Sequence, residues 1–197
     1  SLNNGVAIAG AAASALLMAG AGVLLYTMAR RRGATERMSA LMALGMAVST
    51  ICFCYARSSY GEALQSFLLL WFVERSLRAG ERYTVGVAVT LGLAAGCLFN
   101  SKLVYALVLP LAPLFIGWRF YLRRELPEAE RPAASVQSLI LRGLTSLLAA
   151  LPLFGLALIH NYIKTGSPWR TGYQIQNGVF SGDLLPALYG YVFSTGK

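Results

Sequence analysis

The stretch "GVAIAGAAASALLMAGAGVLLYTM", residues 5–28, decides the fold class of this chain. It contains no charged side chain and is longer than the roughly 20 apolar residues that a helix needs to cross a bilayer. Backbone polar groups in hydrocarbon must be satisfied within the segment, so the stretch predicts a transmembrane helix. Its Gly, Ala and Ser residues suit close packing against neighbouring helices.

The composition of the whole chain agrees with this prediction. Hydrophobic residues make up 56% of it and charged residues only 13%, whereas soluble domains carry about 25% charged residues. The net charge of +9 comes mostly from arginines in short clusters between apolar runs. Membrane topology explains such clusters better than a nucleic-acid surface does, so we expect a bilayer and no nucleic acid as partner. The cysteines form no zinc or disulfide pattern.

Six segments are apolar enough to be predicted as spanning helices. They cover approximately residues 5–28, 39–56, 61–77, 83–99, 103–121 and 138–160. The predicted fold is therefore an all-α, polytopic transmembrane helix bundle. We expect residues 1–160 to form this bundle and residues 161–197 to form an external juxtamembrane segment. Its apolar run at 184–193 is too short to span and could lie on the interface, re-enter, or begin a further span. Pro110, Pro113 and Pro152 are expected to kink their helices.

The distribution of cations between the spans predicts the orientation of the chain. Three alternate connections are rich in arginine, and the other two carry one cation each, Arg57 and Lys102. By the positive-inside rule, the arginine-rich connections are cytoplasmic. The amino end and the segment after His160 are then external. The arginines concerned are Arg30, Arg31, Arg32 and Arg37; Arg75, Arg78 and Arg82; and Arg119, Arg123, Arg124 and Arg131.

Lys102 is the first candidate for chemistry on the external side. In "LFNSKLVYALVLP" we expect a helix to begin near Asn100, Ser101 and Lys102. Backbone N–H groups, the positive end of the helix dipole and an ammonium would then form a phosphate site. The alternative is a lysine that extends to the membrane interface, and spacing alone slightly favours that alternative.

The other polar residues of the external side each have an ordinary structural explanation. Glu62 suits a helix start and could pair with Arg57, either as a structural pair or to orient a substrate. Tyr60 suits an interface anchor, and the single histidine, His160, suits a structural polar group. We find no Ser–His–Asp arrangement, metal cluster or phosphate-binding glycine loop in the sequence. The residues alone therefore predict a membrane protein with a cationic external polar face.

Four stretches resemble bacterial integral-membrane glycosyltransferases similar to protein O-mannosyltransferases, the family 39-like enzymes of the GT-C fold. "NYIKTGSPWRTGY", residues 161–173, is similar to their N-Y-x-x-x-G-S-P-x-x-x-G-Y segment. "LPALYGYVFSTGK", residues 185–197, is similar to the segment that follows it. "YARSSYGEALQSFLLLWFVERSLRAGER", residues 55–82, and "LGLAAGCLFNSKLVYALVLPLAP", residues 91–113, resemble their third-span region and their Lys-containing span junction.

The resemblance implies an enzyme that moves a sugar from a polyprenyl-phosphate donor to a glycan, lipid or protein acceptor on the external face of the bacterial inner membrane. It places Lys102, Arg57, Asn100 and Ser101 at the lipid phosphate of the donor. It places Glu62, Tyr60, Asn161, Lys164, Arg170 and Tyr173 on the cavity or acceptor side. The catalytic carboxylate of the family has no counterpart in this sequence. We therefore expect the chain to be an internal piece, with that residue, and any divalent metal that it binds, upstream of residue 1.

Two other classes of function fit the same residues. A transporter or flippase for a lipid-linked or anionic solute would also need a cationic polar face within a helix bundle. A membrane scaffold without chemistry of its own would need none of these side chains for a ligand.

Overall fold

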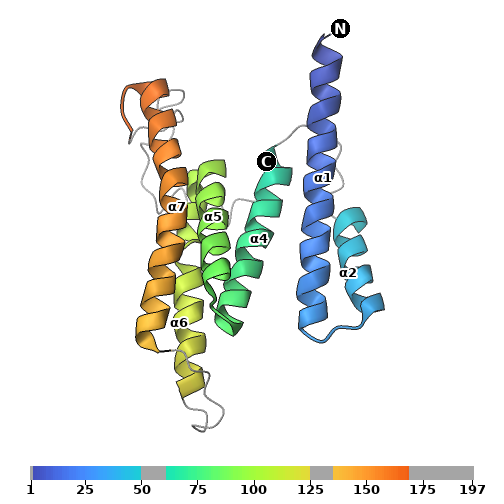
Figure 1. Ribbon diagram of the computed structural model, residues 1–197. Helices are drawn as coiled ribbons and strands as arrows, with labels where there is room; N and C mark the ends of the chain where they lie inside the picture. Colours follow the sequence, from blue (N-terminus) through green and yellow to red (C-terminus); the bar gives the residue numbers. More distant parts are fainter. Residues whose placement is uncertain (1, 50–60, 125–134, 169–197) are drawn as a thin grey trace, which may run out of the picture. The chain divides into compact units, whose positions relative to one another are not determined.

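The structure is a computed structural model that describes residues 2–49, 61–124 and 135–168. The chain divides into two compact units, Ser1–Phe154 (unit 1) and Gly155–Lys197 (unit 2), and each is described by itself. Every regular element among the described residues is a helix, which confirms the all-α class (Figure 1). The helices are α1 (Leu2–Arg31), α2 (Glu36–Ser49), α4 (Gly61–Glu81), α5 (Val85–Ser101), the 3₁₀ helix η1 (Leu103–Leu107), α6 (Leu111–Arg124) and α7 (Val136–Thr165).

Three helical segments in the described residues are long and apolar enough to cross a membrane. They are Ile8–Arg31, Val104–Leu122 and Val136–Thr165, which correspond to the first, fifth and sixth predicted spans. Helix α5 is apolar but has only 17 residues, and the 21 residues of α4 include five charged side chains. The chain is therefore a helical protein with segments suited to a bilayer, and the other three spans stay predictions.

Helices α1 and α2 form a hairpin because the chain reverses at Gly33. Gly33 has a φ of +86°, a left-handed conformation that glycine adopts without steric cost. Its N–H donates to the carbonyl of Arg30, and the N–H of Ala34 donates to that of Ala29, both at 3.1 Å. This pair of bonds is the Schellman arrangement that ends helices. Thr35 then caps α2 through a 3.3 Å bond from the N–H of Met38.

The predicted fifth span is not one continuous helix. Its first part, Leu103–Leu107, is a 3₁₀ helix, and α6 begins only at Leu111, directly after Pro110. Proline has no N–H and clashes with the preceding turn, so it interrupts a helix at this position. Pro113 lies in the first turn of α6, where proline is tolerated, and Pro152 lies inside α7. The expected kink thus becomes a change of helix type at Pro110.

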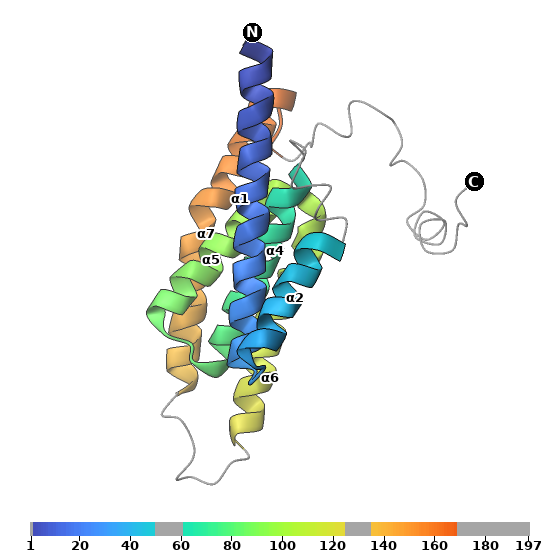
Figure 2. The same ribbon diagram turned by 90° about the vertical axis from the view of Figure 1, so that its right-hand side faces the viewer.

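The core of unit 1 forms around α4, which packs against α1, α5 and α6. Figure 2 shows α2 beside α1 on the side that faces the viewer. Small residues allow the close approach of α1 and α4, as expected for the first span. Ala21 and Ala63 are fully buried, and a Cβ on Gly20 would lie 3.0 Å from the ring of Phe67.

Helix α5 packs closely on the part of α7 that belongs to unit 1. A Cβ on Gly92 would collide with the carbonyl oxygen of Ser146. The hydroxyl of Ser146 donates to the carbonyl of Ala88 at 2.8 Å and lies 2.8 Å from the hydroxyl of Tyr83. These contacts hold α5 and α7 so close together that their backbones touch at Gly92.

Unit 2 begins within α7, which continues beyond the predicted end at His160 to Thr165. Gly166 ends the helix with a φ of +73°, and its N–H donates to the carbonyl of Tyr162 at 2.8 Å. This bond is the left-handed cap that glycine forms at helix ends. Residues 161–165 are therefore helical and continue α7.

Candidate functional site

Lys102 lies at the junction of α5 and η1, and its side chain is exposed. Its backbone is extended, with a φ of −165°, and its N–H donates to the carbonyl of Leu98 at 3.4 Å. A helix junction lies at Lys102, as predicted, because α5 ends at Ser101 and η1 begins at Leu103. Asn100 and Ser101, however, are the last residues of α5 and do not form the start of a helix. The carbonyl end of α5 therefore faces Lys102, and this dipole end favours a cation over an anion. The ammonium itself makes no ion pair with the residues that the structure describes.

Asn100 and Ser101 use their side-chain donors within the protein. The amide nitrogen of Asn100 donates to the carbonyl of Gly96 at 2.9 Å and to that of Leu153, on α7, at 2.6 Å. The hydroxyl of Ser101 donates to the carbonyl of Leu98 at 2.7 Å. A phosphate needs hydrogen-bond donors, and both N–H groups of the Asn100 amide are already used. Within this arrangement Asn100 joins α5 to α7.

We expect Asn100→Ala to lower the stability of unit 1 by about 1 kcal/mol, because it removes the bond to α7. Thermal unfolding of the purified protein in detergent measures this. Ser101→Ala is the matched control, since its bond stays within α5. Equal unfolding temperatures for wild type and Asn100→Ala would show that the bond to Leu153 contributes nothing.

Glu62 lies at the same end of unit 1 as Lys102. It stands in the first turn of α4, half-buried, where the helix dipole favours a carboxylate. The hydroxyl of Tyr105, on η1, donates to the side-chain oxygen of Gln65, on α4, at 3.2 Å. This bond places the start of α4 beside the residues that follow Lys102. We call this end of unit 1, with Glu62, Gln65, Lys102 and Tyr105, the lysine end.

The remaining predicted site residues are not brought to the lysine end by any described contact. Arg57, Tyr60, Arg170 and Tyr173 lie outside the described residues. Asn161 and Lys164 belong to unit 2, where the amide of Asn161 donates to the carbonyl of Pro168 at 3.2 Å. Lys164 is exposed in the last turn of α7, a position that suits a cation beside the carbonyl end of a helix.

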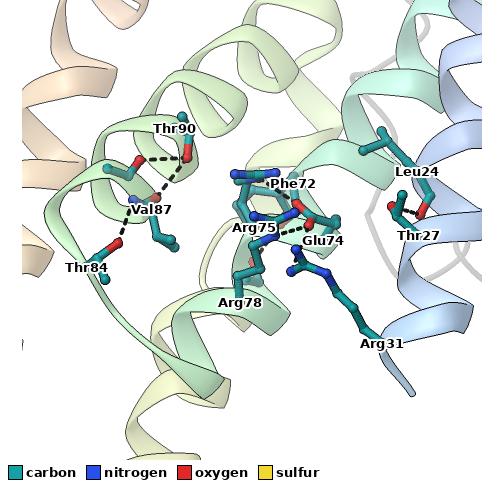
Figure 3. A network of polar contacts seen from close by, with 12 residues as sticks. Leu24, Thr27, Arg31, Phe72, Glu74, Arg75, Arg78, Thr84, Val87 and Thr90 are labelled. Atoms are coloured by element: carbon teal, nitrogen blue, oxygen red, sulfur yellow. Dashed lines mark hydrogen bonds and ion pairs between the residues drawn. The ribbon is translucent and has the colours of Figure 1, made fainter. Parts of the chain in front are cut away.

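A second polar cluster, which is not among the predicted site residues, lies at the opposite end of α4 (Figure 3). Its centre is Glu74, whose side chain is 1% exposed. Arg78 lies one turn further along α4 and donates through Nε to Oε1 of Glu74. Arg75 Nε lies 2.5 Å from Oε2, in an ion pair that lacks hydrogen-bond geometry. Arg31 reaches from the end of α1 to within 3.6 Å of Oε1.

We call this end of unit 1, with Arg31, Glu74, Arg75 and Arg78, the arginine end. Its spacing could have been found in the sequence, because Glu followed by Arg four residues later is the pattern of an ion pair along a helix. What the sequence does not show is the third arginine, Arg31, from a different helix. Removing a carboxylate from water is costly unless it is paired, so the three arginines compensate the charge of the buried glutamate. Only Oε1 accepts a hydrogen bond, and Oε2 has no hydrogen-bond partner among the described residues.

The described residues contain no group of three or more His, Cys, Asp or Glu side chains placed to hold a metal ion. Comparisons with protein-family models, with curated proteins and with solved structures give no match to this chain.

Proposed function

We propose that this chain is part of an integral-membrane glycosyltransferase of the GT-C type. It takes a sugar from a polyprenyl-phosphate donor and passes it to an acceptor on the external face of a bacterial inner membrane. In this proposal all six predicted segments cross the bilayer, with α2, α4 and α5 as the second, third and fourth spans. The four stretches that resemble the family 39-like enzymes are the sequence basis of the proposal.

The observation that carries the proposal is the position of Lys102. It is an exposed cation at the end of an apolar helix, beside the start of α4, and no described residue pairs with it. The 21 residues of α4 make its two ends about 30 Å apart, which is the thickness of the hydrocarbon layer. With the arginine end cytoplasmic, the lysine end lies at the external headgroup layer, where the phosphate of a lipid-linked donor resides.

In the proposed reaction Lys102 stabilises the leaving group. The bond between the sugar carbon and the phosphate oxygen breaks, and its electron pair stays on the polyprenyl phosphate. The acceptor oxygen bonds to the sugar carbon from the opposite side, which inverts the configuration, and a carboxylate outside the chain takes its proton. An ammonium beside the departing phosphate lowers the energy of the negative charge that develops there.

Replacement of Lys102 by alanine tests this role. We expect the rate of transfer to fall about a hundredfold, because one preorganised charge is removed from the developing phosphate anion. The unfolding temperature should not change, since the side chain is exposed. The assay uses membranes that contain the full-length protein and its native acceptors, with labelled polyprenyl-phosphate mannose or glucose. It measures release of free polyprenyl phosphate, which can be followed without knowing which acceptor takes the sugar.

Two control variants define the result. Lys102→Arg keeps a cation and should retain most of the activity, and Arg37→Ala, an exposed change in the first turn of α2, should retain all of it. Full activity of Lys102→Ala would show that Lys102 takes no part in the reaction. Movement of the labelled lipid across vesicles without release of polyprenyl phosphate would instead identify a flippase.

A further inference from the structure

A small cleft lies at the arginine end, between the last turns of α1 and α4. It measures about 10 Å³, which is room for one oxygen-sized group. Met28 and Leu77 form its apolar wall, and three arginines, Arg31, Arg32 and Arg78, line it together with Glu74 and Glu81. Helices α1 and α4 pack directly against each other, so the wall of the cleft is set by the fold of unit 1.

The charge of the cleft is positive despite its two glutamates. Glu74 is already held by three arginines, and the cleft has Arg32 in addition, which makes no ion pair with any residue that the structure describes. Each guanidinium has five N–H donors, so the contacts to Glu74 leave donors free on Arg31 and Arg78. Their side chains are 41% and 31% exposed and can reach a group outside the protein.

The position of the cleft at the end of α1 indicates which kind of anion it could bind. Arg31 is the last residue of the 24-residue candidate span Ile8–Arg31. When this segment crosses a bilayer, the cleft is at the level where the helix leaves the hydrocarbon. That level contains the phosphates of the lipids. The cleft is too small for a whole solute, but a phosphate oxygen can enter it while the glycerol and acyl chains lie along the apolar surface near Met28 and Leu77.

We propose that the cleft formed by Arg31, Arg32 and Arg78 binds the phosphate of an anionic phospholipid headgroup. Basic clefts between helices at the membrane surface are suited to such headgroups. The site lies at the opposite end of α4 from Lys102, so it is independent of the proposed transfer reaction. It would bind a lipid of the surrounding bilayer and would not bind the sugar donor.

The test is thermal unfolding of the purified, delipidated protein in a neutral detergent, with added lipid. Phosphatidylglycerol should raise the unfolding temperature in a saturable manner, because a ligand of the folded state stabilises it by mass action. Phosphatidylcholine at the same concentration should raise it less, and added salt should weaken the difference. Inorganic phosphate is the third ligand, and it should have little effect because it lacks the apolar part.

Variants of exposed residues identify the site without disturbing the buried glutamate. Arg32→Gln should weaken the apparent affinity for phosphatidylglycerol about fivefold, the effect of one cation near a headgroup. Glu81→Gln removes an acidic lining residue and should strengthen it. Arg37→Gln makes the same charge change as Arg32→Gln at an exposed residue that does not line the cleft, and it should leave the affinity unchanged.

Three results would overturn the proposal. Equal shifts with phosphatidylglycerol and phosphatidylcholine would show that the headgroup charge is not recognised. Equal losses for Arg32→Gln and Arg37→Gln would show only a general effect of net charge. A shift with inorganic phosphate as large as that with phosphatidylglycerol would assign the cleft to free phosphate and not to a lipid.

Discussion

Gly92→Ala will destabilise unit 1 by about 3 kcal/mol or more, although alanine favours a helix over glycine. The added Cβ would collide with the carbonyl oxygen of Ser146 and would lie 2.9 Å from the Cβ of Ala149. Both are held by α7, so neither can move aside as the end of a flexible side chain could. Relief requires separation of the two helices, which also breaks the bonds from Ser146 to Ala88 and from Asn100 to Leu153.

The matched control for this prediction is Gly86→Ala in the same helix. A Cβ at Gly86 meets nothing within 4 Å, so only the gain in helix propensity remains. We expect Gly86→Ala to leave stability unchanged or to raise it by up to about 1 kcal/mol. Thermal unfolding of both variants in the same detergent measures the difference. Two variants of equal stability would mean that α5 and α7 do not approach each other at Gly92.

Glu74→Ala is the second change with a large expected effect. It leaves Arg31, Arg75 and Arg78 close together without the carboxylate that compensates their positive charges. Removal of one partner from a buried ion pair costs about 3–5 kcal/mol. The arginines are partly exposed, so solvent screens part of their repulsion and we expect a loss near the lower value. Arg31 links α1 to α4, so the two helices should also become less firmly packed.

Glu81→Ala is the control for Glu74→Ala. Glu81 lies on the same helix but is exposed, and its removal should change stability by no more than about 0.5 kcal/mol. Unfolding temperatures give the stability, and cleavage at the α1–α2 and α4–α5 connections by a protease specific for arginine reports the packing. Similar results for the two variants would contradict a stabilising role for the buried carboxylate.

The sequence predicted the helices better than their contacts. Hydropathy located α1 and α7 and gave the all-α class, because apolar composition and length decide which segments suit a bilayer. The end of α7 was placed too early, since Asn161 and Lys164 are polar but still helical, and the helix ends only where Gly166 supplies a left-handed cap. The break at Pro110 was expected as a kink, and the sequence did not show that the preceding residues form a 3₁₀ helix.

The contacts that other helices make with the two ends of α4 could not be predicted, because they depend on which helix faces become neighbours. Asn100 was expected beside a phosphate, whereas its amide donates to Leu153, which lies far along the chain. Glu74 was not singled out, because a single acid in "WFVERSLR" gives no sign of an arginine contributed by α1. Lys102 was placed correctly at a helix junction, and its role in phosphate binding stays a prediction.

If α4 crosses the bilayer as proposed, the buried Glu74 also has a consequence for how the chain is assembled during synthesis. For α4 to enter a bilayer alone it would have to carry a carboxylate and two arginines from its own sequence into or near the hydrocarbon, which is costly. Arg31 is made before α4, so α1 can already stand in the membrane when Glu74 leaves the ribosome. Insertion of α4 would then depend on prior insertion of α1. The hairpin of α1 and α2 would provide the surface against which α4 packs as it enters.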